Sequence, residues 1–183
     1  MREIDLEQFW NPIVGNMAWQ VRKGYGTFLT MEFGPPHLSV RELAIPPDET
    51  KRPIGGLLSR RRVFVQGTWH LWIKYCSWTI EDHFGSEIRI LKNGEQGEKN
   101  NGEQGDNILQ DLEGQILNNV KSDAQKGTLL AEFDLGSKLL ISPGFDEAEG
   151  PMFSLYGPEK QYSEVRIYAD NSIKAFFGNS DEH

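Results

Sequence analysis

The sequence predicts a mainly β protein with minor α, built from antiparallel strands that form a barrel or a sandwich. Three observations predict this fold class: apolar residues alternate over short segments, glycine, proline and asparagine separate those segments, and helical spacing is confined to one or two short stretches. With 183 residues, of which 38% are hydrophobic, the chain can bury one sizeable core. We therefore expect a single domain over residues 1–183, with ten or more strands in two halves.

The first half begins with a short helix that is followed by strands. Asp5 can cap a helix over residues 6–10, and Pro12 disfavours helical conformation in the residue before it. A glycine-rich turn at residues 23–26 predicts a hairpin between the two strands that flank it. The strands expected in this half are 13–21, 27–33, 37–43, 63–65 and 87–91.

Residues 67–80 are the stretch around which the first half is organised. They contain three of the five tryptophans and the only cysteine, Cys76. Large apolar residues occur at both alternating sets of positions, so we expect a central strand that is covered on both faces, either one long strand or a strand with a kink near Cys76. A lone cysteine cannot form an intramolecular disulfide, and on a strand it acts as a small hydrophobic residue.

A segment of different composition, residues 92–107, separates the halves. The sequence Asn-Gly-Glu-Gln-Gly occurs at 93–97 and again at 101–105, and no large apolar residue lies between Leu91 and Ile108. Such a segment cannot bury enough surface to offset its ordering entropy, which predicts a mobile acidic loop. Its spacing does not match a calcium-binding loop.

Two interpretations are open for residues 108–121. Apolar residues recur at every fourth position from Ile108 to Val120, which predicts one amphipathic helix. Comparison with the first half favours a short helix that ends at Gly114 and a strand over 116–124. The other strands expected in this half are 127–133, 138–141, 152–156, 164–169 and 173–177.

That comparison predicts an internal duplication of the chain. At an offset of 103 residues, a series of similar residues in the two halves is aligned, and Lys23-Gly24 meets Lys126-Gly127. We expect pseudo-repeated halves over 5–91 and 108–177. Among the aligned pairs are Phe9 with Leu112, Ile13 with Ile116, Val14 with Leu117 and Asn16 with Asn119.

The charge of the chain excludes some function classes. The net charge is −8, and the only basic cluster is residues 60–62, whereas nucleic-acid binding requires a basic stripe. The chain has no apolar run of 18 residues and no basic N-terminal region of a signal peptide, so we expect a soluble, cytoplasmic protein with no membrane contact. An acidic surface attracts a protein partner with a basic surface, and an exposed sheet edge could pair two copies into a homodimer.

No constellation of catalytic or metal-binding residues is visible. His70 and Cys76 lie six residues apart on one strand, about 20 Å, which is too far for one metal ion. Glu32 and Glu132 could act as paired carboxylates only if the fold brought them face to face. We therefore expect no metal, no cofactor and no enzymatic activity.

All five tryptophans lie in the first half. Large rings with N–H donors suit an interface or a ligand pocket. These residues give two hypotheses: a non-enzymatic protein-interaction module or, as the alternative, a small-molecule binder with an aromatic-lined cavity. The residues proposed for either site are Trp19, Trp69, Trp72, Tyr75 and Trp78.

The chain also resembles a family of small uncharacterised bacterial β-rich proteins over roughly residues 5–170. The family implies no catalytic residues. Some similar small acidic proteins are immunity proteins of bacterial toxin systems, and this likeness implies a protein-binding function. The motifs that carry the resemblance are Trp19-x-Val21-x-x-Gly24-x-Gly26-Thr27, Leu29-Thr30-x-Glu32-Phe33-Gly34 and Gly67-x-Trp69-x-Leu71-Trp72-Ile73.

Overall fold

The computed structural model describes residues 1–42, 60–85, 87–90, 109–123, 125–143, 152–168 and 172–179. The predicted loop over 92–107 lies outside these ranges. The described part is mainly β, as predicted, and all paired strands are antiparallel. None of the described helices is long and apolar enough to cross a membrane.

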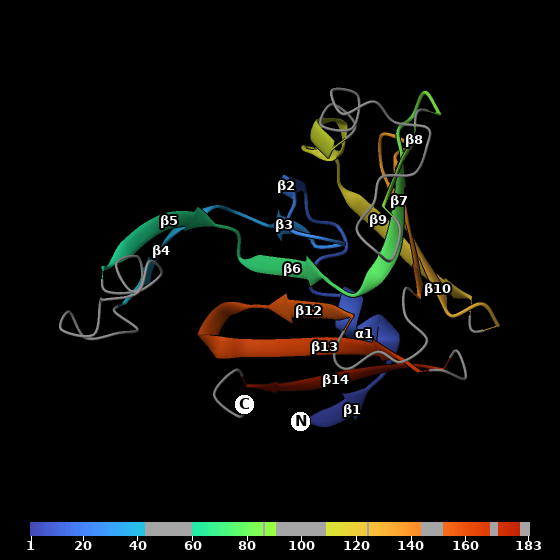
Figure 1. Cartoon of the computed structure of the whole chain (residues 1–183). Coiled ribbons are helices and arrows are strands. Elements are labelled where there is room, and N and C mark those ends of the chain that lie inside the picture. Colours follow the sequence, from blue (N-terminus) through green and yellow to red (C-terminus); the bar gives the residue numbers. More distant parts are fainter. Residues whose placement is uncertain are drawn as a thin grey trace.

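The strands form two larger sheets and a separate two-stranded ribbon (Figure 1). The seven-stranded sheet has the order β1 (Arg2–Ile4), β14 (Ile173–Asn179), β13 (Gln161–Ile167), β12 (Phe153–Tyr156), β6 (Trp69–Ile73), β3 (Leu29–Phe33) and β2 (Ala18–Lys23). The five-stranded sheet has the order β8 (Glu87–Ile90), β7 (Cys76–Glu81), β11 (Lys138–Pro143), β10 (Thr128–Phe133) and β9 (Leu117–Asp123). The ribbon pairs β4 (His37–Arg41) with β5 (Arg62–Gln66).

Both larger sheets are open, so the predicted barrel alternative is wrong for the described residues. The strands of the two sheets run in different directions in Figure 1, and helix α1 (Leu6–Trp10) lies where the sheets meet. One face of each sheet supplies the common core, because alternate residues such as Leu129, Ala131 and Phe133 are buried. A 3-10 turn over Pro158–Lys160 (η2) connects β12 to β13.

Residues 67–80 are not one strand, because the chain bends between β6 and β7 and passes from one sheet to the other. Tyr75 at the bend has φ +55°. The bend changes which alternate positions face the core: Leu71 and Ile73 are buried before it, and Cys76 and Trp78 after it. Both strands are central, as expected, but the apolar residues at both sets of positions reflect the bend and not a strand covered on two faces.

The structure decides between the two interpretations of residues 108–121. Residues 109–112 are helical and β9 begins at Leu117, which confirms the short helix followed by a strand. Gly114, with φ +86°, ends the helix in the left-handed conformation that glycine adopts without strain. The predicted helix over 6–10 and the β2–β3 hairpin are also confirmed.

Candidate functional site

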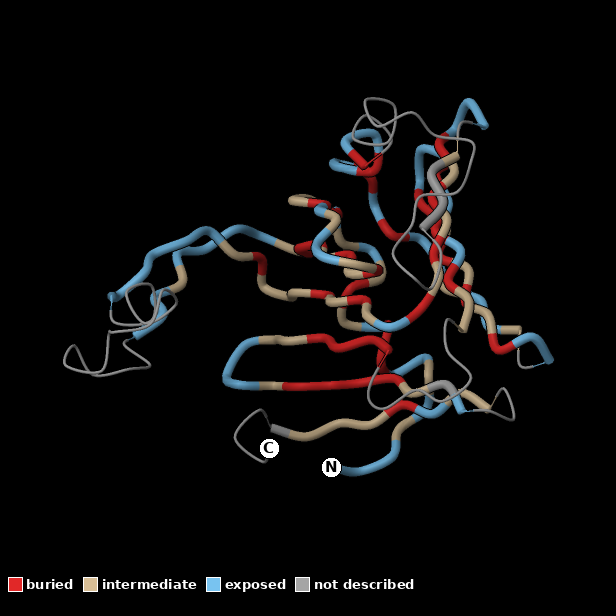
Figure 2. The backbone as a smooth tube through the Cα atoms, in the orientation of Figure 1, coloured by how far each residue is buried: buried red, intermediate tan, exposed pale blue. Residues whose placement is uncertain are grey.

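The β4–β5 ribbon extends away from both larger sheets (Figure 1), and we call it the arm. Leu38 is the Cα partner of Val65, and Val40 is the partner of Val63, so these side chains share one face. They are 71%, 43%, 50% and 60% exposed in that order. We call this set of four residues the apolar face, and Figure 2 shows most of the arm coloured as exposed.

The end of the arm distant from the sheets is rich in arginine. Arg41 and Arg62 are Cα partners, and both are exposed. Arg61 forms an ion pair with Glu42, with Nε and Oε2 3.0 Å apart. The Arg41 guanidinium lies 5.6 Å from the centre of the Phe64 ring, a cation–π contact across the arm.

A second group of polar residues lies on the face of the seven-stranded sheet that is turned away from the core. The register places Glu32, His70, Tyr156 and Tyr162 side by side on β3, β6, β12 and β13. His70 Nδ1 lies 2.7 Å from Glu32 Oε1, and the Gly67 N–H donates to Glu32 Oε2 (3.0 Å). A carboxylate acceptor at Nδ1 favours the tautomer with the proton on that nitrogen, so Nε2 is the nitrogen that Glu32 does not hold.

A second buried carboxylate, Glu164, lies on the same face. It accepts a hydrogen bond from the Tyr162 hydroxyl (2.7 Å) and forms an ion pair with Arg166 (Nη2–Oε1 2.6 Å). Burial, together with the bond to Glu164, raises the pKa of Tyr162. Burial also raises the pKa of Tyr156 and lowers that of Lys74. Glu164 is therefore fully paired and holds the tyrosine as a neutral donor.

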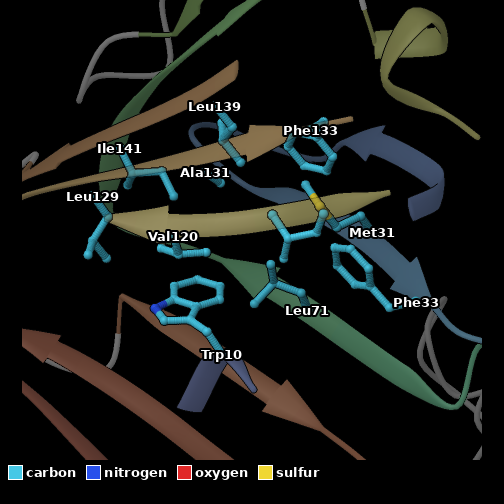
Figure 3. Close-up of a pocket in the computed structure, with 11 residues that line it drawn as sticks. Trp10, Met31, Phe33, Leu71, Val120, Leu129, Ala131, Phe133, Leu139 and Ile141 are labelled. Carbon is cyan, nitrogen blue, oxygen red and sulfur yellow. The ribbon is translucent and has the colours of Figure 1, made fainter. Parts of the chain in front are cut away.

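The core contains a small cavity between the sheets. Figure 3 shows Trp10 of α1 beside it, with Leu71 of β6 and Leu129 of β10 among the other lining residues. Its volume is about 10 Å³, which is room for about one water molecule. Trp10 Nε1 is buried and has no hydrogen-bond partner among the described residues. A cavity of this size cannot accommodate a small-molecule ligand.

Three of the tryptophans proposed as site residues lie apart from one another and make separate contacts. The Trp19 indole N–H donates to Gly34 O (3.0 Å), and the buried Trp78 indole N–H donates to Thr27 O (2.8 Å). The Trp69 ring packs against Gly157, where a Cβ atom would collide with it. None of these rings lines the cavity between the sheets.

Trp72 and Tyr75 are the two proposed residues that the structure brings together. Both rings meet Phe28 edge to face, with centroids 5.7 and 5.8 Å away. Lys74 Nζ lies 4.6 Å from the centre of the Trp72 ring. This cluster lies on the outer face of the sheet, away from the core cavity.

The structure also shows where the residues considered for a carboxylate pair, a metal site and a nucleophile lie. Glu32 lies on β3 and Glu132 on β10, in different sheets, so they are not a face-to-face pair. The described residues contain no group of three side chains suited to a metal ion. Cys76 is fully buried, and burial raises the pKa of its thiol, which opposes nucleophilic reactivity.

Sequence reasoning missed the apolar face and the Glu32–His70 pair. Alternation predicted both strands of the arm, but alternation does not say whether an apolar face is covered. The contact between Glu32 and His70 depends on the register of β3 and β6, and no local pattern specifies which residues lie opposite each other.

Comparison with protein-family models, curated proteins and solved structures finds no match. The family resemblance carried by the sequence motifs therefore stays a hypothesis. A function for the chain has to be argued from its own geometry.

Proposed function

We propose that the protein is a non-enzymatic protein-interaction protein and that the apolar face of the arm is its docking surface. One observation carries the proposal: Leu38, Val40, Val63 and Val65 are all exposed on one face of a two-stranded ribbon. Single exposed apolar residues are ordinary, but a contiguous apolar patch is typical of an interaction site.

The energetics of the arm support this proposal. An isolated pair of strands is only marginally stable in water. Burying a valine or leucine side chain completely contributes roughly 1.5–3 kcal/mol. A partner that covered the apolar face would therefore gain binding free energy and would also stabilise the arm, with part of the gain offset by the ordering of both surfaces.

The charge of the arm indicates the chemistry of the partner's contact surface. Arg41 and Arg62 are exposed at the end of the arm, next in sequence to Val40 and Val63 but on the opposite face of the ribbon. Arginine pairs well with carboxylates, so a partner that covers this end of the arm could contact both faces. We infer that the partner is a protein with an apolar strip beside acidic side chains.

The net charge of −8 separately favours a partner whose wider surface is basic, because opposite charges speed association. An immunity-like function would take this form, and we retain it as a proposal. Arg62→Glu distinguishes the two ideas. It slows association if the contact surface is acidic and speeds association if that surface is basic.

Native mass spectrometry of the protein purified gently from its own source tests the docking surface. The arm variant is Val40→Ser with Val63→Ser, and the matched control is Leu135→Ser with Leu140→Ser, two exposed apolar residues of the β10–β11 hairpin. We expect wild type and control to retain the same additional protein chain and the arm variant to lose it. Retention by the arm variant would contradict the proposal, and loss of a second copy would identify a homodimer instead.

We also propose that the halves 5–91 and 108–177 arose by duplication. In each half a short helix precedes a hairpin, β2–β3 or β9–β10, and a bridge between Met17 and Ile116 joins the two units. Superposition of residues 6–33 on 109–133 in an experimental structure tests this. Helices on opposite sides of the two hairpins would contradict it.

A further inference from the structure

An open groove lies between the arm and strands β2, β3 and β6, and its lining on the arm extends from Gln66 at the base to Arg41 at the arginine-rich end. Its volume is about 420 Å³, within the range of small-molecule sites. The sheet contributes Arg22, Glu32 and His70 to its lining, and the arm contributes Arg41 and Gln66. Val65 is the one residue of the apolar face in this lining, so the groove borders the docking surface, but it needs no protein partner.

A β-bulge places Arg22 in this groove. Trp19 is the Cα partner of Glu32, but the next pair is Arg22 with Thr30, so β2 contains one extra residue between these pairs. In a regular strand Arg22 would lie on the core face, opposite in direction to Trp19. Gln20 adopts φ +47° within the bulge, a strained conformation for a residue other than glycine. The strained backbone at Gln20 accompanies the bulge that turns the Arg22 side chain from the core face to the groove.

The groove has an excess of positive charge although the chain is acidic. In the described part of the chain, neither Arg22 nor Arg41 forms an ion pair. Glu32 is the one carboxylate of the lining, and both of its oxygens are engaged, by His70 Nδ1 and by the Gly67 N–H. Two guanidinium groups therefore line a groove in which the only carboxylate of the lining, Glu32, already accepts hydrogen bonds at both oxygens.

His70 adds a third group to this arrangement. Its Nδ1 is held by Glu32 at 2.7 Å, which fixes the ring in the lining of the groove. With Nδ1 engaged by Glu32, Nε2 is the ring nitrogen left for a ligand atom in the groove. The other charged residues of the lining are Glu32 from β3, Arg22 from β2 and Arg41 from β4, and the centroid of the Tyr156 ring of β12 lies 6.1 Å from that of His70.

We propose that this groove binds the phosphoryl or carboxylate group of a small molecule between Arg22, Arg41 and His70. Arginine forms bidentate, charge-assisted hydrogen bonds with both kinds of oxyanion. Glu32 is a positioning residue that acts through His70. Because the arm supplies Arg41 and the sheet supplies Arg22, a bound anion would bridge the arm and the sheet.

Titrations with inorganic phosphate and with succinate, each at constant ionic strength and followed by ¹H–¹⁵N NMR of the full chain, test the site. We expect at least one of these anions to give saturable shifts centred on Arg22, Thr30, His70 and Arg41. Saturation by phosphate alone assigns a phosphoryl ligand, and saturation by succinate alone assigns a carboxylate ligand. The absence of saturable shifts with both anions would overturn the proposal.

Two charge variants separate a specific site from general attraction. Arg22→Gln with Arg41→Gln should weaken anion binding about tenfold or more, since hydrogen bonds to charged groups are lost. Lys121→Gln with Lys126→Gln removes the same charge from the β9–β10 region and should leave the affinity within about twofold. Equal effects of both variants would overturn the proposal. The arm variant Val40→Ser with Val63→Ser should still bind the anion, so failure of the docking surface and failure of this site are distinguishable.

Discussion

Two hairpins of this protein have the same alternating pattern of apolar residues, but the apolar face is buried in one and exposed in the other. In the β10–β11 hairpin, Leu129 pairs with Ile141 and Ala131 with Leu139, and these side chains are at most 5% exposed. In the arm, the corresponding apolar pairs are 43–71% exposed. The first apolar face is covered by the core, and the second is covered by no other strand of the described chain.

The difference shows that alternation specifies a strand and its two faces, but not what covers the apolar one. For β10–β11, the opposing sheet and α1 provide the cover, and the hairpin contributes to folding. For the arm, we propose that a partner provides the cover, in which case its apolar residues contribute to binding and little to folding. Variants of the two hairpins should therefore behave differently.

The largest expected difference concerns stability. Leu129→Ala should lower the free energy of unfolding by about 2–5 kcal/mol, because it removes a buried side chain and leaves a cavity. Val63→Ala should change it by less than about 0.5 kcal/mol, since its side chain is largely exposed. Urea unfolding of both variants measures this, and a comparable loss in the arm variant would show that the arm is part of the folding core.

Glu32 and Glu132, the carboxylates at similar positions in the two halves, sharpen the comparison. Glu32→Gln should cost about 1–3 kcal/mol, because a buried carboxylate that pairs with His70 and Gly67 is replaced. Glu132 pairs with the exposed Lys121 (Oε2–Nζ 2.6 Å), and Glu132→Gln should cost less than about 1 kcal/mol. Chemical denaturation at low salt compares the two, and equal losses would contradict the burial argument.

The buried thiol of Cys76, on β7 next to β11, tests burial in the covered region through the pH dependence of stability. Burial raises its pKa in the folded protein, so the unfolded chain loses the proton first as the pH rises. Stability should be unaffected below the unfolded thiol pKa of about 8.5 and should then fall by roughly 1.4 kcal/mol per pH unit. Cys76→Ala should remove this fall in stability at high pH. Urea unfolding at about pH 7.5 and at about pH 10, on either side of the thiol pKa, measures it. An unchanged pH profile would contradict the assignment.

Thiol labelling gives a smaller and more local test. Cys76 should react with a thiol reagent only as fast as the protein opens, because the thiolate is the reactive form and burial opposes it. In the Cys76→Ala background, Val63→Cys should react at the rate of an exposed thiol. Similar rates at both positions would contradict the contrast between the two regions.

The sequence predicted local features of this fold better than long-range ones. Asp5 is at the N-cap position of α1, although its side chain makes no capping hydrogen bond, and the helix ends before Pro12 as expected. The turn at residues 23–26 indicated the β2–β3 hairpin, because these features depend on neighbouring residues. A kink near Cys76 was one of the alternatives for residues 67–80, but that the chain bends at Tyr75 with positive φ and passes into the other sheet could not be predicted, because tertiary structure holds that conformation.

The candidate site depended even more on tertiary structure. The choice of tryptophans as site residues followed from their size and their donors, and the structure separates Trp19, Trp69 and Trp78 from one another. The Glu32–His70 contact joins residues 38 positions apart, and it arises only when β3 pairs with β6. The residues of the arm were recognised as strands, but their exposure could not be known without the sheet order.

Hydrogen exchange of the free protein and of its complex, measured by mass spectrometry, tests the central claim most directly. In the free protein, amides of β4 and β5 should exchange much faster than those of β10 and β11, because no core covers the arm. In the complex, the arm amides should become protected while β10 and β11 stay unchanged. Protection of the arm in the free protein, or a complex that leaves its exchange unaltered, would contradict the assignment of the arm as the docking surface.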